Sequence, residues 1–106
     1  IAIKDAYRKA IGLLTSKEIR AVRELYAISQ SDLCAVLGWG GKTLTRYEGY
    51  QVQDKAHNAI LKKIAKDPEW FLEMLDESKD ELLVENYLKY RKKAEDLIVR
   101  AKREKQ

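Results

Sequence analysis

Few residues in this chain break a helix, and they divide it into short segments. Its 106 residues include five glycines and one proline, which stand at Gly12, Gly38, Gly40, Gly41, Gly49 and Pro68. Between them, apolar residues recur at steps of three and four, the period of a helix that buries one face. A β-sandwich or barrel needs more turn residues than this. The chain is therefore expected to be all-α.

Length and composition predict one compact domain, and the sequence shows no nucleophile with a base, no phosphate loop and no metal cluster. A chain that is 45% apolar and 36% charged can bury one core at this length. The single Cys34 and the single His57 cannot build a disulfide framework or a Cys/His metal site. We expect no enzyme, no cofactor in this chain, and no membrane span, since no apolar run approaches the roughly 18 residues required. The first residue, Ile1, is not Met, so a longer protein is expected.

Helix start and stop signals divide the chain into three regions. Residues 15–78 are expected to form the main domain. Its first helix begins at a capping box in Thr15-Ser16-Lys17-Glu18, and its last helix begins at Asp67-Pro68. Residues 79–106 contain no Gly or Pro and predict a C-terminal amphipathic helix. Residues 1–14 predict a lead-in helix or linker from a missing N-terminal region. Its inward residues are expected to be Ile3, Tyr7, Ala10, Ile11 and Leu14.

Two of the predicted helices are very short and are joined by a tight turn. The first is capped by Ser29-Gln30-Ser31-Asp32 and stops at Gly38 after about two turns. Trp39-Gly40-Gly41 forms the turn, and the next helix is expected from about Gly41 to Glu48. Its outer face would carry Lys42, Thr45 and Arg46, and its inner face Leu44 and Tyr47. In such an arrangement the last short helix can enter the major groove of DNA.

These residues carry a resemblance to a known family. The stretch from Ser29 to Glu48 resembles the Xre/Cro-type helix-turn-helix, whose pattern is S-Q-x-x-L-A-x-x-L-G-v-s-x-x-t-v-s-R-w-E. The chain is also similar to the C-terminal domain of MqsA-like antitoxins. The similar segments are Leu-Gly-Trp-Gly-Gly-Lys-Thr-Leu-Thr-Arg-Tyr-Glu, then Ile60-Leu61-Lys62-Lys63-Ile64, and then Asp67-Pro68-Glu69. The similarity covers roughly Asp5 to Leu75. It implies a compact five-helix, lambda-repressor-like domain, here extended by a long C-terminal helix.

The resemblance implies sequence-specific DNA binding by an autorepressor. It assigns a phosphate contact to Gln30, an ion pair with Arg20 or Arg23 to Glu48, and base-edge contacts to the third helix. Arg and Lys can donate to guanine O6 and N7, and a good bidentate pair discriminates by about 1–3 kcal/mol. The DNA-binding residues implied are Gln30, Gly41, Lys42, Thr43, Thr45 and Arg46.

The same resemblance implies partners. In that family an N-terminal, Cys-rich zinc domain meets the toxin, and the C-terminal domain dimerises on palindromic operator DNA. This chain lacks the zinc-ligating cysteines, so zinc and a toxin contact are expected only in a region outside it. Double-stranded DNA and a second copy of the chain are the expected partners here. The expected location is the cytoplasm, at the bacterial nucleoid.

Charge is segregated along the chain. Residues 41–66 carry a net charge of +4 and residues 67–86 a net charge of −7, so only part of the surface should face an anionic partner. The alternative is that these charges are ordinary solvated helix faces.

The expected C-terminal helix, from about Asp80, carries a heptad pattern. Its apolar positions follow spacings of four and three, which predicts a seam that needs a partner surface. That surface is either the body of the same domain or the same helix in a second chain. The rival function is a protein-interaction module that holds a partner through this seam. The residues of the C-terminal seam are Leu83, Tyr87, Tyr90, Ala94 and Leu97.

Overall fold

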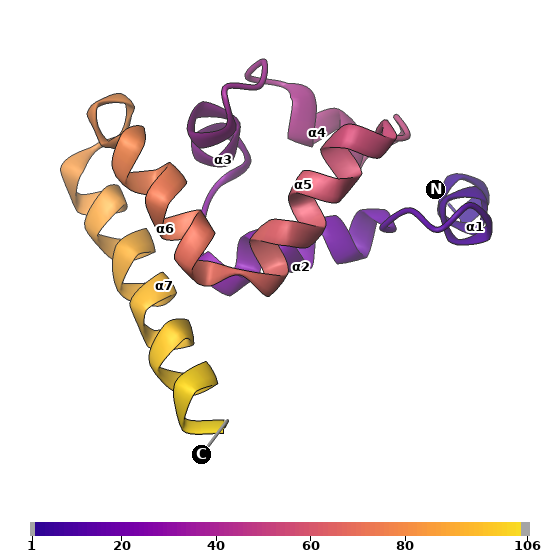
Figure 1. The fold of residues 1–106 in the computed structure, drawn as a ribbon. Coiled ribbons are helices and arrows are strands. Elements are labelled where there is room, and N and C mark those ends of the chain that lie inside the picture. The colour runs from indigo at the N-terminus through magenta and orange to yellow at the C-terminus, as the bar shows by residue number, and fades with distance from the viewer. Residues whose placement is uncertain (1, 105–106) are drawn as a thin grey trace.

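Seven α-helices and one short 3₁₀-helix make up the part of the chain that the structure describes (Figure 1). The structure is a computed structural model, which describes the backbone of residues 2–104 and the side chains of residues 4–104. No strand occurs within these residues, so the expected all-α class is confirmed. The elements are α1 (Ala2–Ala10), α2 (Ser16–Tyr26), α3 (Gln30–Leu37), α4 (Thr43–Glu48), α5 (Lys55–Lys66), α6 (Pro68–Glu77), η1 (Lys79–Glu81) and α7 (Val84–Glu104).

The helix count differs from the expected five-helix domain with one long C-terminal helix. In the region before Thr15, for which a lead-in helix or linker was expected, residues 2–10 form the helix α1. The C-terminal helix does not begin near Asp80, because η1 intervenes and Leu82 follows in an extended, buried conformation. Residues 1 and 105–106 of the expected terminal regions lie outside the described residues.

Side-chain caps fix where the helices begin. Thr15 accepts a hydrogen bond from the backbone N–H of Glu18, and the Glu18 side chain accepts one from Thr15, which confirms the capping box. Ser29 caps α3 and Asp54 caps α5 in the same way. Asp67 caps α6 with Pro68 in its first turn, where the missing proline N–H costs no hydrogen bond.

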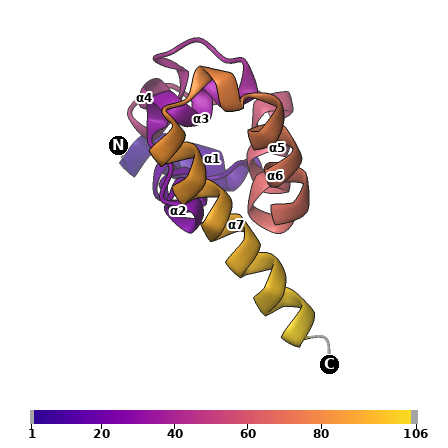
Figure 2. The ribbon, with the colours of Figure 1, turned by 90° about the vertical axis from the view of Figure 1, so that its left-hand side faces the viewer.

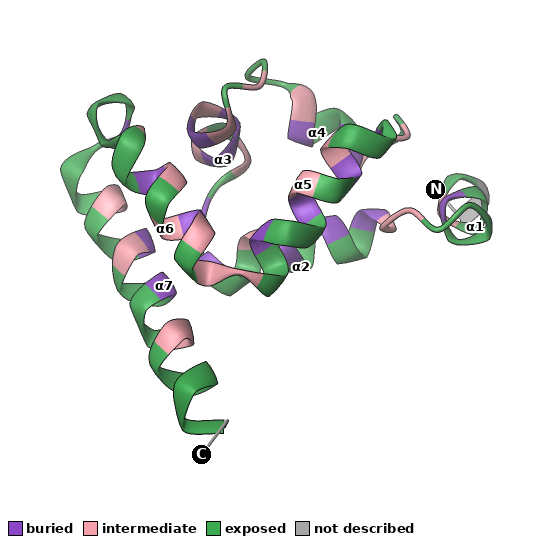
Figure 3. Ribbon diagram, viewed as in Figure 1, coloured by how far each residue is buried: buried purple, intermediate pink, exposed green. Residues whose placement is uncertain are grey.

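One apolar core is shared by α2 to α6 and is closed by α7 (Figures 2 and 3). At its centre the rings of Tyr26 and Phe71 stack with centroids 3.8 Å apart. The Tyr26 hydroxyl donates to the carbonyl of Ile64 at 2.7 Å, which satisfies its polar end inside the core. The fully buried aliphatic side chains around this pair include Ile19, Leu33, Leu44, Leu61 and Leu75.

The C-terminal helix α7 lies along α6 (Figure 1) and reaches α2 (Figure 2). Of the C-terminal seam, Tyr90 and Ala94 are buried in the core, Tyr87 and Leu97 are half-buried against it, and Leu83 is exposed. The seam therefore faces its own domain, which is one of the two arrangements that the sequence left open. Tyr90 and Ala94, expected as partner contacts, are covered by the chain itself.

Helix α1 is oriented differently from the expectation. Tyr7 and Ile11, expected inward, are 54% and 48% exposed, and Ala10 is exposed as well. The side chain of Ile3 lies outside those described. Among residues 4–10 of α1 the buried side chain is Arg8, because its guanidinium donates to backbone carbonyls of the main domain. Among the described residues, no helix is both long enough and apolar enough to cross a bilayer.

Candidate nucleic-acid interface

The turn between α3 and α4 is tight and is closed by backbone hydrogen bonds. Gly38 ends α3 with a φ of 71°, a left-handed conformation that favours glycine. The N–H of Trp39 donates to the carbonyl of Cys34 at 2.9 Å, and that of Thr43 to Gly40 at 3.0 Å. Helix α4 starts at Thr43, two residues later than expected, and Lys42 takes its N-cap position. Helices α3 and α4 are therefore joined by a short turn that backbone hydrogen bonds hold in place.

Helix α4 has an apolar underside and a polar outer face. Leu44 is 0% and Tyr47 is 5% exposed, as expected for residues that anchor the helix on the core. Lys42, Thr45 and Arg46 are all exposed on the other side. The N–H of Arg46 donates to the carbonyl of Lys42 at 3.1 Å, so the two cations lie one helical turn apart.

Neither cation of the outer face is neutralised. Within residues 4–104, no ion pair joins Lys42 or Arg46 to an acidic side chain. Gly41 is exposed, and a side chain built there would meet no atom within 4 Å. Thr43, which was expected to contact DNA, is half-buried.

Helices α3 and α4 are joined at their surface by a hydrogen bond between Thr45 and Gln30. The Thr45 hydroxyl donates to the side-chain oxygen of Gln30 at 2.8 Å. Because that oxygen is the acceptor, the amide NH₂ of Gln30 stays free to donate to another group. Gln30, Thr45 and the two cations beside Thr45 thus form one polar surface. We call Gln30, Gly41, Lys42, Thr45 and Arg46 the α3–α4 surface.

An ion pair fixes the end of α4 to α2. Glu48 accepts two hydrogen bonds from Arg23, at 2.5 and 2.7 Å, and Arg20 lies 3.6 Å from the same carboxylate. The expected pairing of Glu48 with the first helix of the domain is confirmed, with both arginines. The hydrogen bonds with Glu48 raise the pKa of Arg23 above its ordinary value. This bidentate pair sets the direction of α4 on its support.

An aromatic cluster supports the turn from below. The Trp39 ring stacks on the His57 ring of α5 with centroids 4.0 Å apart. The Tyr47 hydroxyl is 2.8 Å from Nδ1 of His57, and burial raises the pKa of Tyr47. The His57 ring is half-buried and links the turn, α4 and α5.

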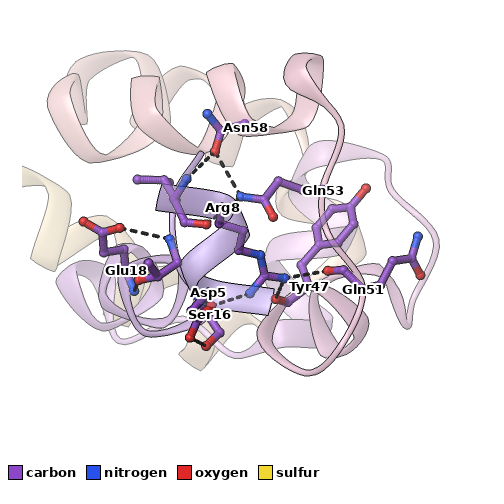
Figure 4. A network of polar contacts seen from close by, with 10 residues as sticks. Asp5, Arg8, Ser16, Glu18, Tyr47, Gln51, Gln53 and Asn58 are labelled. Atoms are coloured by element: carbon purple, nitrogen blue, oxygen red, sulfur yellow. Dashed lines mark hydrogen bonds and ion pairs between the residues drawn. The ribbon is translucent and has the colours of Figure 1, made fainter. Parts of the chain in front are cut away.

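Arg8 is a supporting residue that sequence reasoning missed (Figure 4). Its guanidinium donates to the backbone carbonyl of Tyr47 at 2.7 Å and to that of Gln51 at 2.6 Å, and it pairs with Asp5 at 2.8 Å. Asp5 in turn accepts from the N–H and the hydroxyl of Ser16, both at 2.9 Å. The end of α4 is therefore held by α1 as well as by α2.

Within the described side chains, no group of three or more His, Cys, Asp or Glu residues could hold a metal ion. The thiol of Cys34 is free and buried. What the surface offers is donors and positive charge, at exposed positions on a well-supported short helix.

Comparison of the chain with protein-family models, with curated proteins and with solved structures finds no match. Function is therefore inferred from the residues of the α3–α4 surface and from their geometry.

Proposed function

We propose that this chain is a sequence-specific DNA-binding domain of the helix-turn-helix kind, with α4 as its reading helix. In this proposal α2 to α6 are the five helices of a lambda-repressor-like domain, and α7 is an addition to it. Lys42 and Arg46 would reach base edges in the major groove, and Gln30 would donate to a phosphate at the start of α3. Gly41 leaves room for close approach of the backbone, and Thr45 would contact either a thymine methyl or a phosphate.

The observation that carries the proposal is the outward pair of Lys42 and Arg46. Among the described side chains neither cation has an ion-pair partner, and the two stand one turn apart, above an underside formed by Leu44 and Tyr47. The bond between Thr45 and Gln30 places a free amide beside them. A merely solvated helix face has no need for such supports, whereas base readout needs side chains held in place.

The biological role proposed is that of the operator-binding part of an antitoxin-type autorepressor. A dimer on a palindrome would present two copies of α4, with half-site centres about one helical turn, ~34 Å, apart. A toxin would be bound through a region outside this chain, and the protein would act in the bacterial cytoplasm. No catalytic step is proposed.

The rival proposal is a protein-interaction module that holds a partner through the C-terminal seam. It is supported less well, because Tyr90 and Ala94 are covered by the chain itself. It also leaves the two outward cations of α4 without a role.

The test is binding to DNA selected from a pool of duplexes with a random central segment. The double variant Lys42→Ala with Arg46→Ala should lose specific binding by about a hundredfold or more, since each base contact is worth about 1–3 kcal/mol. Its circular dichroism and unfolding midpoint should stay unchanged, because both side chains are exposed.

The matched control removes two other exposed cations, Lys66 and Lys102. They lie in the last turns of α5 and α7, which Figure 1 shows at the end of the molecule away from α4. This control should keep specific binding. The proposal is wrong if the chain selects no sequence, or if the α4 double variant binds the selected site as tightly as the control does.

A further inference from the structure

A surface groove runs between α2 and α5 and continues to the last turns of α7. Its first part has a volume of about 380 Å³ and its second part a volume of about 210 Å³. Both parts are lined by Leu25, Ala65 and Lys66, so they form one continuous groove, which we call the α2–α5 groove. Its apolar lining includes Leu14, Ala21, Val22, Leu25, Ala65 and Leu97.

The apolar lining of the α2–α5 groove is accessible from outside. Leu25, where the two parts meet, is 39% exposed, and Ala21 and Ala65 are exposed as well. The two alanines are too small to fill the space above them. Concave, mostly apolar surfaces of this size are typical of binding sites. The groove can therefore accept apolar side chains of a partner.

Three cations follow the groove along its length. Lys62 and Lys66 lie one turn apart on α5, about 6 Å along the helix axis, and Arg100 lies on α7. Within residues 4–104, none of the three takes part in an ion pair. The Nζ of Lys62 donates to the backbone carbonyl of Gly12 at 3.4 Å, which leaves its charge without an acidic partner. All three cations are thus available to an anionic partner.

Two acidic side chains also line the groove, one in each part. Glu18 lines the first part, beside Leu14 and Lys62, and its carboxylate already accepts the N–H of Thr15 in the cap of α2. Glu104 lines the second part, in the last turn of α7. The cations outnumber them, so a partner with acidic side chains is favoured.

The spacing of the cations favours a helix over a small anion. A fatty-acid carboxylate has one charged group and needs cations at one end of the groove. Here Lys62 lines the first part, Lys66 lines both parts, and Arg100 lines the second part. An amphipathic helix has an apolar ridge and can carry acidic side chains at every third or fourth position along one flank. Such a helix matches both the apolar lining and the spread of positive charge.

We propose that the α2–α5 groove is a docking site for an acidic amphipathic helix of a partner protein. The apolar ridge of that helix packs on Leu25 and the two alanines, and its acidic flank meets Lys62, Lys66 and Arg100. No residue of the α3–α4 surface lines the groove. The last turns of α5 and α7 lie at the end of the molecule away from α4 (Figure 1), so the docking site is separate from the proposed DNA-binding surface.

The test is a selection of helical peptides, displayed on phage, by the whole chain without DNA. Each peptide is about four helical turns long, with leucine fixed at every third or fourth position and random residues at the flanking positions. The selected peptides should carry Asp or Glu along one flank.

Charge reversal shows where a selected peptide binds. The double variant Lys62→Glu with Lys66→Glu should weaken binding of an acidic peptide by about tenfold or more. A peptide with lysine in place of its acidic residues should bind this variant more tightly than it binds wild type. The matched control, Lys9→Glu with Lys55→Glu, carries the same charge change at exposed positions outside the groove and should bind the acidic peptide like wild type.

A second variant blocks the groove without changing charge. Ala21→Trp places a large ring in the groove from an exposed position and should weaken peptide binding by about tenfold or more. The circular dichroism of all these variants should match that of wild type, because every changed residue is exposed.

Four results would overturn the proposal. They are selected peptides without an excess of acidic residues, equal peptide binding by the Lys62 and Lys66 double variant and its control, unchanged binding to Ala21→Trp, and binding of dodecanoate in the groove when no peptide is selected. The last result would assign the groove to a small anion. Because no DNA is present, these measurements and those on α4 decide their two proposals separately.

Discussion

The guanidinium of Arg8 and the backbone carbonyl of Tyr47, 2.7 Å apart, join the first helix to the last turn of the proposed reading helix. The carbonyls at a helix C-terminus have no partner within the helix. Arg8, 39 positions away in sequence, donates a hydrogen bond to the carbonyl of Tyr47 and another to the carbonyl of Gln51. With 0% of its surface exposed, Arg8 acts as an internal brace for α4.

Replacing Arg8 by Ala should lower the free energy of unfolding by about 2–4 kcal/mol. The buried carbonyl of Tyr47 and the part-buried carbonyl of Gln51 would lose a charged donor, and Asp5 would lose its ion-pair partner, so the cost exceeds that of one ordinary hydrogen bond. Urea unfolding followed by circular dichroism measures this difference.

The matched control is Lys9→Ala, which removes the adjacent exposed cation of the same helix. It should change the free energy of unfolding by no more than about 0.5 kcal/mol. Equal stability of the two variants would show that Arg8 does not brace α4.

Asp5 should make stability depend on acid pH. Hydrogen bonds from the N–H of Ser16, and then from Arg8 and the Ser16 hydroxyl, hold the pKa of Asp5 below its ordinary value, against the opposing effect of burial. A depressed folded-state pKa stabilises the fold above the unfolded-state value, near 3.8, and this stabilisation is lost as the pH falls through the folded-state value.

Asp5→Asn should therefore be less stable than wild type at about pH 7, and the gap in thermal midpoint should close toward about pH 2.5. Asp80→Asn, at an exposed position in η1, serves as the control and should run parallel to wild type. A gap for Asp5→Asn that stays constant over this range would contradict the assignment.

The bond between Thr45 and Gln30 should matter for DNA binding and little for folding. Thr45→Val and Gln30→Ala should each weaken specific binding, and the double variant should lose less than the two losses added. The expected coupling is about 0.5–1.5 kcal/mol, because each single change already frees the other side chain.

Thr45→Ser, which keeps the hydroxyl, is the control and should retain the coupling to Gln30. Additive losses would mean that the two side chains act separately. Unfolding midpoints of all the variants should stay close to wild type, since Thr45 is exposed and Gln30 is half-buried.

Local signals explain why the starts of α2 and α3 and the end of α3 could be predicted. A cap such as Thr15 acts within three residues, and Gly38 stops α3 because it adopts a left-handed conformation itself. The inward positions of Leu44 and Tyr47 follow from helix periodicity alone. The exposed positions of Lys42 and Arg46 follow from the same periodicity.

Contacts between distant residues explain what could not be predicted. An apolar stripe predicts which face of a helix is buried, but α1 buries Arg8 because two backbone carbonyls, 39 and 43 positions away in sequence, accept its hydrogen bonds. Whether the C-terminal seam faces its own domain or a second chain depends on how α7 meets α6, which local spacing does not determine. The ring stack of His57 needs the turn residue Trp39 from a different segment.

That ring stack leads to a further prediction, because Trp39 belongs to the turn that positions α4. His57→Ala should lower the free energy of unfolding by about 1–2 kcal/mol, through loss of the stack on Trp39 and of the hydrogen bond with the Tyr47 hydroxyl. It should also change the near-ultraviolet circular dichroism of Trp39. His57→Phe should restore the stack and most of that spectrum but not the hydrogen bond, so its stability should lie between that of wild type and that of His57→Ala.

Lys55→Ala, an exposed change on the same helix, is the control. An unchanged spectrum and midpoint in His57→Ala would show that the cluster does not support the turn.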